Sequence, residues 1–147
     1  MKFLKDFRTI AGKTMFRHEL LNALKESLDN LYPTDVHEIC ENRLFISVSK
    51  MSGNIPKFGF NEENVLYSEF TCKEDLINKI AASCLVPFWA GTKWEALDGH
   101  NFYDGGFTDN LPEIRGKETL RIQPFSTTKE RAEISVNRYF TFTVAAP

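Results

Sequence analysis

Residues 103–112 read Tyr103-Asp104-Gly105-Gly106-Phe107-Thr108-Asp109-Asn110-Leu111-Pro112. This stretch places an acid at the end of a short apolar run, follows it with two glycines, and then turns the chain. Glycines adopt backbone angles that other residues resist, and they allow another main chain or a substrate to approach the acid. An isolated Asp-Gly-Gly sequence is more often a plain turn in which the acid only caps the backbone. The alternative is that Asp104 orients or deprotonates a bound group, and the surrounding sequence has to decide between the two.

The composition of the chain predicts one globular domain that does not bind nucleic acid. Its 147 residues are enough for one domain with a real core and too few for two comfortable ones. Hydrophobic residues make up 42% of the chain, which argues against wholesale disorder. The formal net charge is only -2, so the chain lacks the basic surplus of a dedicated nucleic-acid binder. No apolar run is long enough to span a bilayer, and no charged-then-apolar stretch marks a signal sequence.

The cysteines and histidines do not form a metal-binding pattern. The cysteines are odd in number and have no close pair or zinc spacing, which fits a reducing compartment; they are Cys40, Cys72 and Cys84. The histidines are scattered, so no local HxxxH-type site can be built; they are His18, His37 and His100. We therefore expect neither a metal site nor an organic cofactor.

Residues 1–15 form a basic amphipathic segment. Lysines and an arginine face a single acid, Asp6, and apolar residues recur at helical spacing, at Phe3, Leu4, Phe7, Ile10 and Ala11. Three interpretations stay open for this segment. It is a helix lying on a membrane surface, a presequence-like targeting segment, or a solvated helix with one buried face.

The rest of the chain alternates helical and strand patterns. Apolar residues at 3.6 spacing predict a helix over 16–31, followed by a polar connection over 34–42. A second helix is predicted to follow Thr71 and to end at Pro87. Strands are predicted over 44–48, 65–70, 119–124 and 134–144, with a brief run over 100–103. This order favours an α/β fold, in which chemistry collects at the carboxyl ends of strands, and Asp104 lies where a strand would end.

Two local patterns frame the second helix. Thr71-Cys72-Lys73-Glu74 matches a capping box, in which Thr71 accepts the Glu74 amide and Glu74 reaches back. Residues 88–97, which include Trp89 and Trp94, are predicted to be an aromatic loop that either lines an apolar pocket or covers the core.

Five segments together resemble the patatin-like phospholipase domain family, in the branch of adipose triglyceride lipase and adiponutrin. They follow one another in the order seen in that family: Leu44-Phe45-Ile46-Ser47-Val48-Ser49, then Phe70-Thr71-Cys72-Lys73-Glu74-Asp75-Leu76-Ile77, then Ala82-Ser83-Cys84-Leu85-Val86-Pro87, then the 103–112 stretch, then Ile122-Gln123-Pro124-Phe125-Ser126. The resemblance covers most of residues 16 to 144.

The resemblance implies a three-layer α/β/α fold and a serine-aspartate dyad that hydrolyses acyl esters. Asp104 would be the catalytic acid of the Asp-Gly-Gly motif and would take the proton from a serine hydroxyl, which is a poor nucleophile until a base removes that proton. Gly105 and Gly106 would keep side chains away from the scissile ester. The substrate would be triacylglycerol or a phospholipid, and the protein would be cytoplasmic and peripheral on lipid droplets or membranes, with a possible protein coactivator.

The chain departs from the family where the nucleophile is expected. It has no G-x-S-x-G elbow and no glycine-rich oxyanion loop, and loss of the oxyanion donors alone costs on the order of a hundred- to a thousandfold in rate. Ser52 reads as a turn residue and Ser83 as packing, so we assign no nucleophile. We therefore expect 16–147 to be a partial α/β patatin-like domain that lacks the nucleophile half.

Three hypotheses follow from this partial match. The parent activity is lipolysis through Asp104; or the chain is a non-catalytic module that binds a lipid surface or a partner; or it does not fold alone because neighbouring strands lose their pairing. A truncated isoform, a partial gene model and a decayed copy all fit the sequence, and we expect the chain alone to be inactive.

Overall fold

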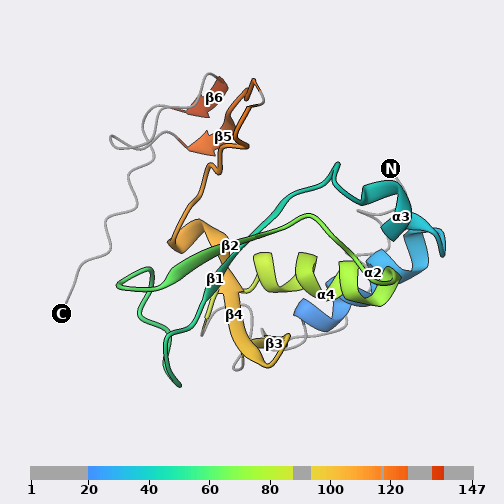
Figure 1. The fold of residues 1–147 in the computed structure, drawn as a ribbon, viewed down its shortest axis with the longest axis horizontal. Coiled ribbons are helices and arrows are strands. Elements are labelled where there is room, and N and C mark those ends of the chain that lie inside the picture. The colour runs from blue at the N-terminus through green and yellow to red at the C-terminus, as the bar shows by residue number, and fades with distance from the viewer. Residues whose placement is uncertain (1–19, 88–93, 117, 126–133, 138–147) are drawn as a thin grey trace. The chain divides into compact units, whose positions relative to one another are not determined.

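The computed structural model describes residues 20–87, 94–116, 118–125 and 134–137 of the chain (Figure 1). The structure divides into two units, residues 1–110 and residues 111–147, which we describe separately. The expected basic segment over 1–15 and part of the expected aromatic loop, 88–93, lie outside the described residues.

A four-stranded antiparallel sheet forms the centre of the first unit. Its strands lie in the order β2-β1-β4-β3 and are β1 (Ile46–Lys50), β2 (Glu63–Tyr67), β3 (Glu95–Leu97) and β4 (His100–Asp104). Val48 of β1 lies opposite Val65 on one side and opposite Asp104 on the other. The register therefore places Asp104 beside the middle of the best-buried strand.

Helices α2 (Leu20–Leu31) and α4 (Lys73–Ser83) cover this sheet. Helix α4 contacts β1, β3 and β4, and α2 packs against α4, as Figure 1 shows. The face of α4 toward the sheet carries Leu76, Ile77, Ala81 and Ala82, all buried. A third helix, the short α3 (Val36–Cys40), occupies the segment that the sequence predicted to be a polar connection. That prediction was wrong because Val36 is buried in the core.

The start of α4 is capped one residue later than the sequence predicted. The Sγ of Cys72 accepts the amide of Asp75 at 3.5 Å, so Cys72, and not Thr71, is the N-cap. The Asp75 carboxylate accepts from the Thr71 amide at 2.8 Å, the part that the capping box assigned to Glu74. Thr71 and Glu74, the predicted pair, and Cys72 and Asp75 are each three residues apart, and the helix uses Cys72 and Asp75.

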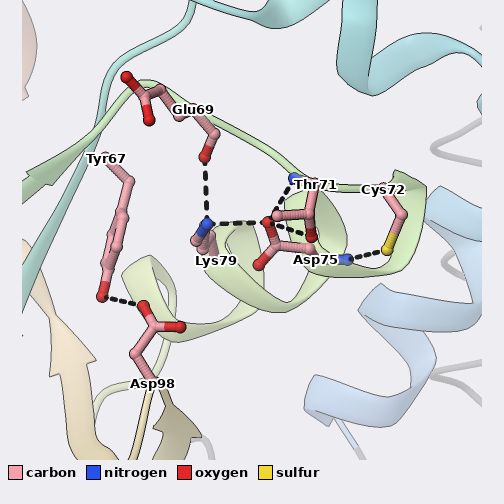
Figure 2. Close-up of polar contacts among 7 residues, drawn as sticks. All are labelled: Tyr67, Glu69, Thr71, Cys72, Asp75, Lys79 and Asp98. Atoms are coloured by element: carbon pink, nitrogen blue, oxygen red, sulfur yellow. Dashed lines mark hydrogen bonds and ion pairs between the residues drawn. The ribbon is translucent and has the colours of Figure 1, made fainter.

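Lys79 is a nearly buried cation that links α4 to the sheet (Figure 2). Its ammonium donates to the Asp75 carboxylate at 2.8 Å and to the carbonyl of Glu69 at 3.1 Å, and it lies 4.6 Å from the centre of the Tyr67 ring. The Tyr67 hydroxyl in turn donates to Asp98 at 3.0 Å. Figure 2 shows the hydrogen bonds of Lys79 and Asp75 at the start of α4 and, separately, the hydrogen bond from Tyr67 to Asp98.

Strand β4 is buried on both of its faces. Phe102 packs with Val48 and Leu76 in one core cluster, whereas its neighbour Tyr103 packs with Leu85 in another. Alternate residues of a strand point to opposite faces, so these two side chains fix β4 from both sides. Because Phe102 and Tyr103 are fixed in this way, the position of Asp104, the next residue, is well defined.

The second unit holds two parallel strands, β5 (Ile122–Phe125) and β6 (Ile134–Asn137), with Ile122 opposite Ile134. Strands were predicted over 119–124 and 134–144, and a strand is present in both places. Strand β5 begins and ends later than predicted, and residues 138–144 of the second predicted strand lie outside the described residues. The α/β class is also confirmed. One further correction concerns Glu95–Leu97, which the sequence assigned to the aromatic loop and which forms strand β3, paired with β4.

Candidate active site

Asp104 is the last residue of β4, and its main chain is held from two directions. Its amide donates to the carbonyl of Leu85 at 2.9 Å, and its own carbonyl accepts the hydroxyl of Ser49 at 2.7 Å. The sequence prediction that the acid stands at a strand end is therefore confirmed.

The Asp104 side chain caps the turn that follows and keeps one oxygen available. Its Oδ1 accepts the amide of Gly106 at 2.8 Å, at the start of the single-turn 3-10 helix η2 (Gly105–Phe107). In the part of the chain that the structure describes, no hydrogen bond reaches Oδ2. Burial raises the pKa of the Asp104 carboxyl above its usual value, and the Gly106 amide offsets only part of that rise. A carboxylate held by a single amide, with a raised pKa, is suited to accept a proton.

Gly105 is required by a close approach of two main chains. A Cβ built on Gly105 would lie 2.2 Å from the carbonyl oxygen of Ser47, far inside contact distance. The expectation that another main chain comes near the acid is confirmed here. The expectation of unusual backbone angles is wrong, because neither Gly105 nor Gly106 has a positive φ.

A partly buried network of hydroxyl and amide groups supports the turn on the side of β1 and β2. Ser49, which is fully buried, shares a hydrogen bond of 2.8 Å with Thr108. Asn64 donates to both Thr108 and Ser47 at 2.8 Å, and Ser47 donates to the carbonyl of Asp109 at 3.1 Å. The network fixes the backbone around Asp104. Sequence reasoning did not assign these residues, although two serines alternating with Ile46 and Val48 in an otherwise apolar strand are a signal for it.

A partly open cavity of about 410 Å³ lies in front of Asp104. Its polar wall includes Ser47, Ser83, Asp104, Asp109 and Asn110, and its apolar wall includes Tyr32, Leu44, Phe45, Ile46 and Ile80. Asp104 is therefore not sealed inside its turn. A cavity with an apolar wall and a few polar groups is typical of a small-molecule site.

The two serines considered as substitutes for a nucleophile differ in position. Ser83 lines the same cavity as Asp104, but its hydroxyl donates to the carbonyl of Ile80 at 2.8 Å, one turn back in α4. Ser52 is exposed in the loop after β1 and does not line this cavity. Neither serine donates a hydrogen bond to Asp104 in the structure.

Within the described ranges, no group of three or more His, Cys, Asp or Glu side chains is placed to hold a metal ion. Across the same ranges, no helix is both long enough and apolar enough to cross a membrane.

The sequence of the chain is similar to those of several known proteins. The chain is 32% identical over 126 residues to patatin-like phospholipase domain-containing protein 4 of Homo sapiens, a match covering 85% of this chain and 47% of the relative. It is 34% identical over 107 residues to patatin-like phospholipase domain-containing protein 2 of Mus musculus, covering 73% of this chain and 20% of the relative. A 1-acylglycerol-3-phosphate O-acyltransferase of Homo sapiens is 31% identical over 102 residues, covering 69% and 20%.

The chain belongs to the patatin-like phospholipase domain family. It spans about half the length of the first of these relatives and about a fifth of the other two. No family model matches the chain, and no solved structure matches it. The patatin-like resemblance of the sequence is thus confirmed, and it is a resemblance to part of the relatives.

Proposed function

We propose that this chain supplies the acid of a serine-aspartate dyad in a patatin-like acyl hydrolase, with Asp104 as the base. The observation that carries the proposal is the hydrogen bonding of that carboxyl group and its position in the cavity wall. One oxygen is anchored by the Gly106 amide, the second is unbonded within the described structure, and Asp104 lines a cavity. Membership of the patatin-like family supports a lipid as the substrate.

In the proposed reaction, Oδ2 of Asp104 takes the proton from a serine hydroxyl as the serine oxygen attacks an acyl ester carbonyl carbon. The ester bond then breaks, and the proton passes from Asp104 to the leaving alcohol. The same carboxylate then takes a proton from water as the water oxygen attacks the acyl carbon. The bond to the serine oxygen breaks, the serine oxygen regains the proton from Asp104, and the fatty acid leaves. The raised pKa of Asp104 makes its carboxylate a stronger base than an exposed aspartate, which favours the first step.

The serine has to come from residues that this sequence does not contain. No G-x-S-x-G elbow occurs in the chain, and the hydroxyl of Ser83 is engaged by its own helix. The apolar wall of the cavity, which includes Leu44 and Ile80, suits an acyl chain. We propose triacylglycerol or another acylglycerol ester as the substrate, with a phospholipid as the alternative, at the surface of lipid droplets or membranes facing the cytoplasm. A protein coactivator is compatible with this role.

A chimera tests the assignment of Asp104. The nucleophile half of a patatin-like relative, with its G-x-S-x-G elbow, is joined ahead of residue 16, and hydrolysis of a p-nitrophenyl ester and of a triacylglycerol emulsion is measured. Asp104→Asn should lower the rate about a hundred- to ten-thousandfold, since it removes the general base.

The matched control is Asp98→Asn, which changes the same side chain at an exposed turn position bonded to Tyr67. Asn tolerates the positive φ of Asp98, so this variant should remain folded and active. Hydrolysis that survives Asp104→Asn at the control rate would contradict the assignment.

A second function is favoured by the missing elbow. In this second function, residues 1–147 form a non-catalytic module that binds a lipid surface. Purified chain should in that case bind vesicles and leave p-nitrophenyl esters intact, and turnover that survives Asp104→Ala would contradict both proposals.

A further inference from the structure

The loop between β1 and β2 carries the most exposed large apolar side chains of the described residues. Ile55 is 70% exposed and Phe60 is 79% exposed, and Phe58 between them is 48% exposed. We call these three residues the apolar tip. Figure 1 shows the loop extending away from the helices that cover the sheet. Grouped exposed apolar side chains of this kind mark a surface that is covered in use.

The loop is held in place by hydrogen bonds that involve Tyr103 of strand β4 and Glu62. The hydroxyl of Tyr103 donates to the Glu62 carboxylate, and the Gly59 amide donates to the Tyr103 hydroxyl at 3.0 Å. The Lys57 amide donates to the other oxygen of Glu62 at 3.1 Å. These hydrogen bonds order the loop while Ile55 and Phe60 stay exposed. The exposure of the tip is therefore a property of the ordered loop.

The apolar tip is also tied to the turn that carries Asp104. The ring of Phe58 packs on Phe107 with centroids 5.5 Å apart, and Phe107 packs on Tyr103 at 5.4 Å. A Cβ on Gly59 would lie 2.2 Å from the Phe107 carbonyl oxygen, so the loop and the turn approach each other as closely as main chains can. The loop of the tip therefore lies against the turn that follows Asp104.

The charges of the loop are compatible with an anionic lipid surface. Lys57, which is exposed, is the one ionisable side chain from Met51 to Asn61. The nearest acid in the sequence, Glu62, is turned inward to Tyr103, and its pKa lies below its usual value: burial would raise it, but the hydrogen bonds from Tyr103, Lys57 and Gly59 outweigh that effect. An outward cation among aromatic and aliphatic side chains complements the anionic head groups and apolar interior of a lipid surface.

We propose that the apolar tip inserts Ile55 and Phe60 into a lipid surface, with Lys57 at the head groups. The choice of lipid as partner rests on the lipid-directed function proposed above, but the insertion itself needs no catalysis. It places the opening beside Asp104 near the interface from which an acyl substrate would enter.

Vesicle sedimentation of the full chain tests the proposal. The vesicles contain equimolar phosphatidylcholine and phosphatidylserine. Ile55→Ser/Phe60→Ser should weaken partition roughly ten- to a hundredfold, because each removed side chain is worth about a factor of ten at an apolar interface. The matched control is Leu31→Ser/Ile39→Ser, which removes two exposed apolar side chains from α2 and α3 and should partition like the unmodified chain.

A fluorescence readout locates the contact even if part of the binding comes from residues 1–15. In Phe60→Trp, brominated lipid should quench the fluorescence of the added tryptophan. In Ile39→Trp, made in the otherwise unmodified chain, it should not. Equal partition of the two double variants, or equal quenching of the two tryptophan variants, would overturn the proposal. Loss of self-association in Ile55→Ser/Phe60→Ser with unchanged vesicle binding would also overturn it, in favour of a second copy of the chain as partner.

The outcome is independent of the dyad. Asp104→Asn should partition like the unmodified chain, so loss of hydrolysis and loss of membrane binding are separate results. Thermal unfolding of each loop variant should stay close to that of the unmodified chain, since the substituted side chains are exposed.

Discussion

Asp75 and Asp104 are both partly buried aspartates near α4, and their surroundings are opposite in kind. The Asp75 carboxylate is enclosed by Lys79 and Thr71. Burial alone would raise its pKa, but the hydrogen bonds and the charge of Lys79 outweigh burial, so its pKa lies below the usual value. Asp104 has only the Gly106 amide, and its pKa lies above the usual value. The comparison separates a carboxylate that is enclosed by several donors from one that accepts a single main-chain hydrogen bond.

The largest effect on the free energy of unfolding should come from removing the cation that pairs with Asp75. Lys79→Met removes the cation that pairs with Asp75 and the side-chain donor to the Glu69 carbonyl, so that the carboxylate keeps only its Thr71 donors. We expect a loss of about 3 kcal/mol in the free energy of unfolding. Denaturant titration measures it. On the same helix, Lys73→Met removes a cation whose partner Asp29 is 69% exposed, and it should cost no more than about 1 kcal/mol. Equal losses in the two variants would show that Lys79 is not a structural cation.

The next effect comes from the close packing behind Asp104. Gly105→Ala forces a Cβ onto the Ser47 carbonyl and should cost about 2 kcal/mol in unfolding free energy. Gly53→Ala is the control, because nothing lies within 4 Å of its added Cβ, and it should change stability by less than about 0.5 kcal/mol. A Gly105→Ala protein as stable as Gly53→Ala would mean that the turn does not lie against β1.

A smaller effect, but one of opposite sign at the two sites, should appear in the pH dependence of stability. The lowered pKa of Asp75 contributes stability that is present above its unfolded-state pKa and is lost as pH falls through the folded-state pKa. The raised pKa of Asp104 acts in reverse: stability falls as pH rises from the unfolded-state pKa through the folded-state pKa, because the folded state keeps its proton longer.

At neutral pH, Asp75→Asn should therefore lower Tm, with a cost of about 1–2 kcal/mol, while Asp104→Asn should raise it. Tm measured from acidic to neutral pH for both variants checks the sign. If both substitutions move Tm in the same direction at neutral pH, the contrast between the two sites is wrong.

Some of this arrangement was predictable from the sequence and some was not, for physical reasons. The apolar stripes of α2 and α4 and the alternation in β1 are strong signals because they span several turns or pairs, and they located these elements. Helix α3 and strand β3 are too short to show a period, so they were read as a polar connection and as loop.

The position of Asp104 at a strand end was indicated by its flanking glycines. The two serines of β1 signal a polar network, but their partners in that network were not predictable. Ser49 meets Thr108 across 59 residues of sequence, and no local pattern reports such a pairing. The cap of α4 was misplaced by one residue because Thr71 and Cys72 each have an acid three positions on, and only the folded backbone distinguishes them.

The central claim is that the fold leaves the Asp104 carboxylate as a poised base, and its own titration tests this most directly. Side-chain carboxyl NMR of the full chain, with Asp104→Asn to assign the resonance and Asp75 as an internal comparison, gives both midpoints in one experiment. The account predicts that Asp104 titrates above its usual value of 3.8 and Asp75 below it. A midpoint for Asp104 at or below that of Asp75 would contradict it.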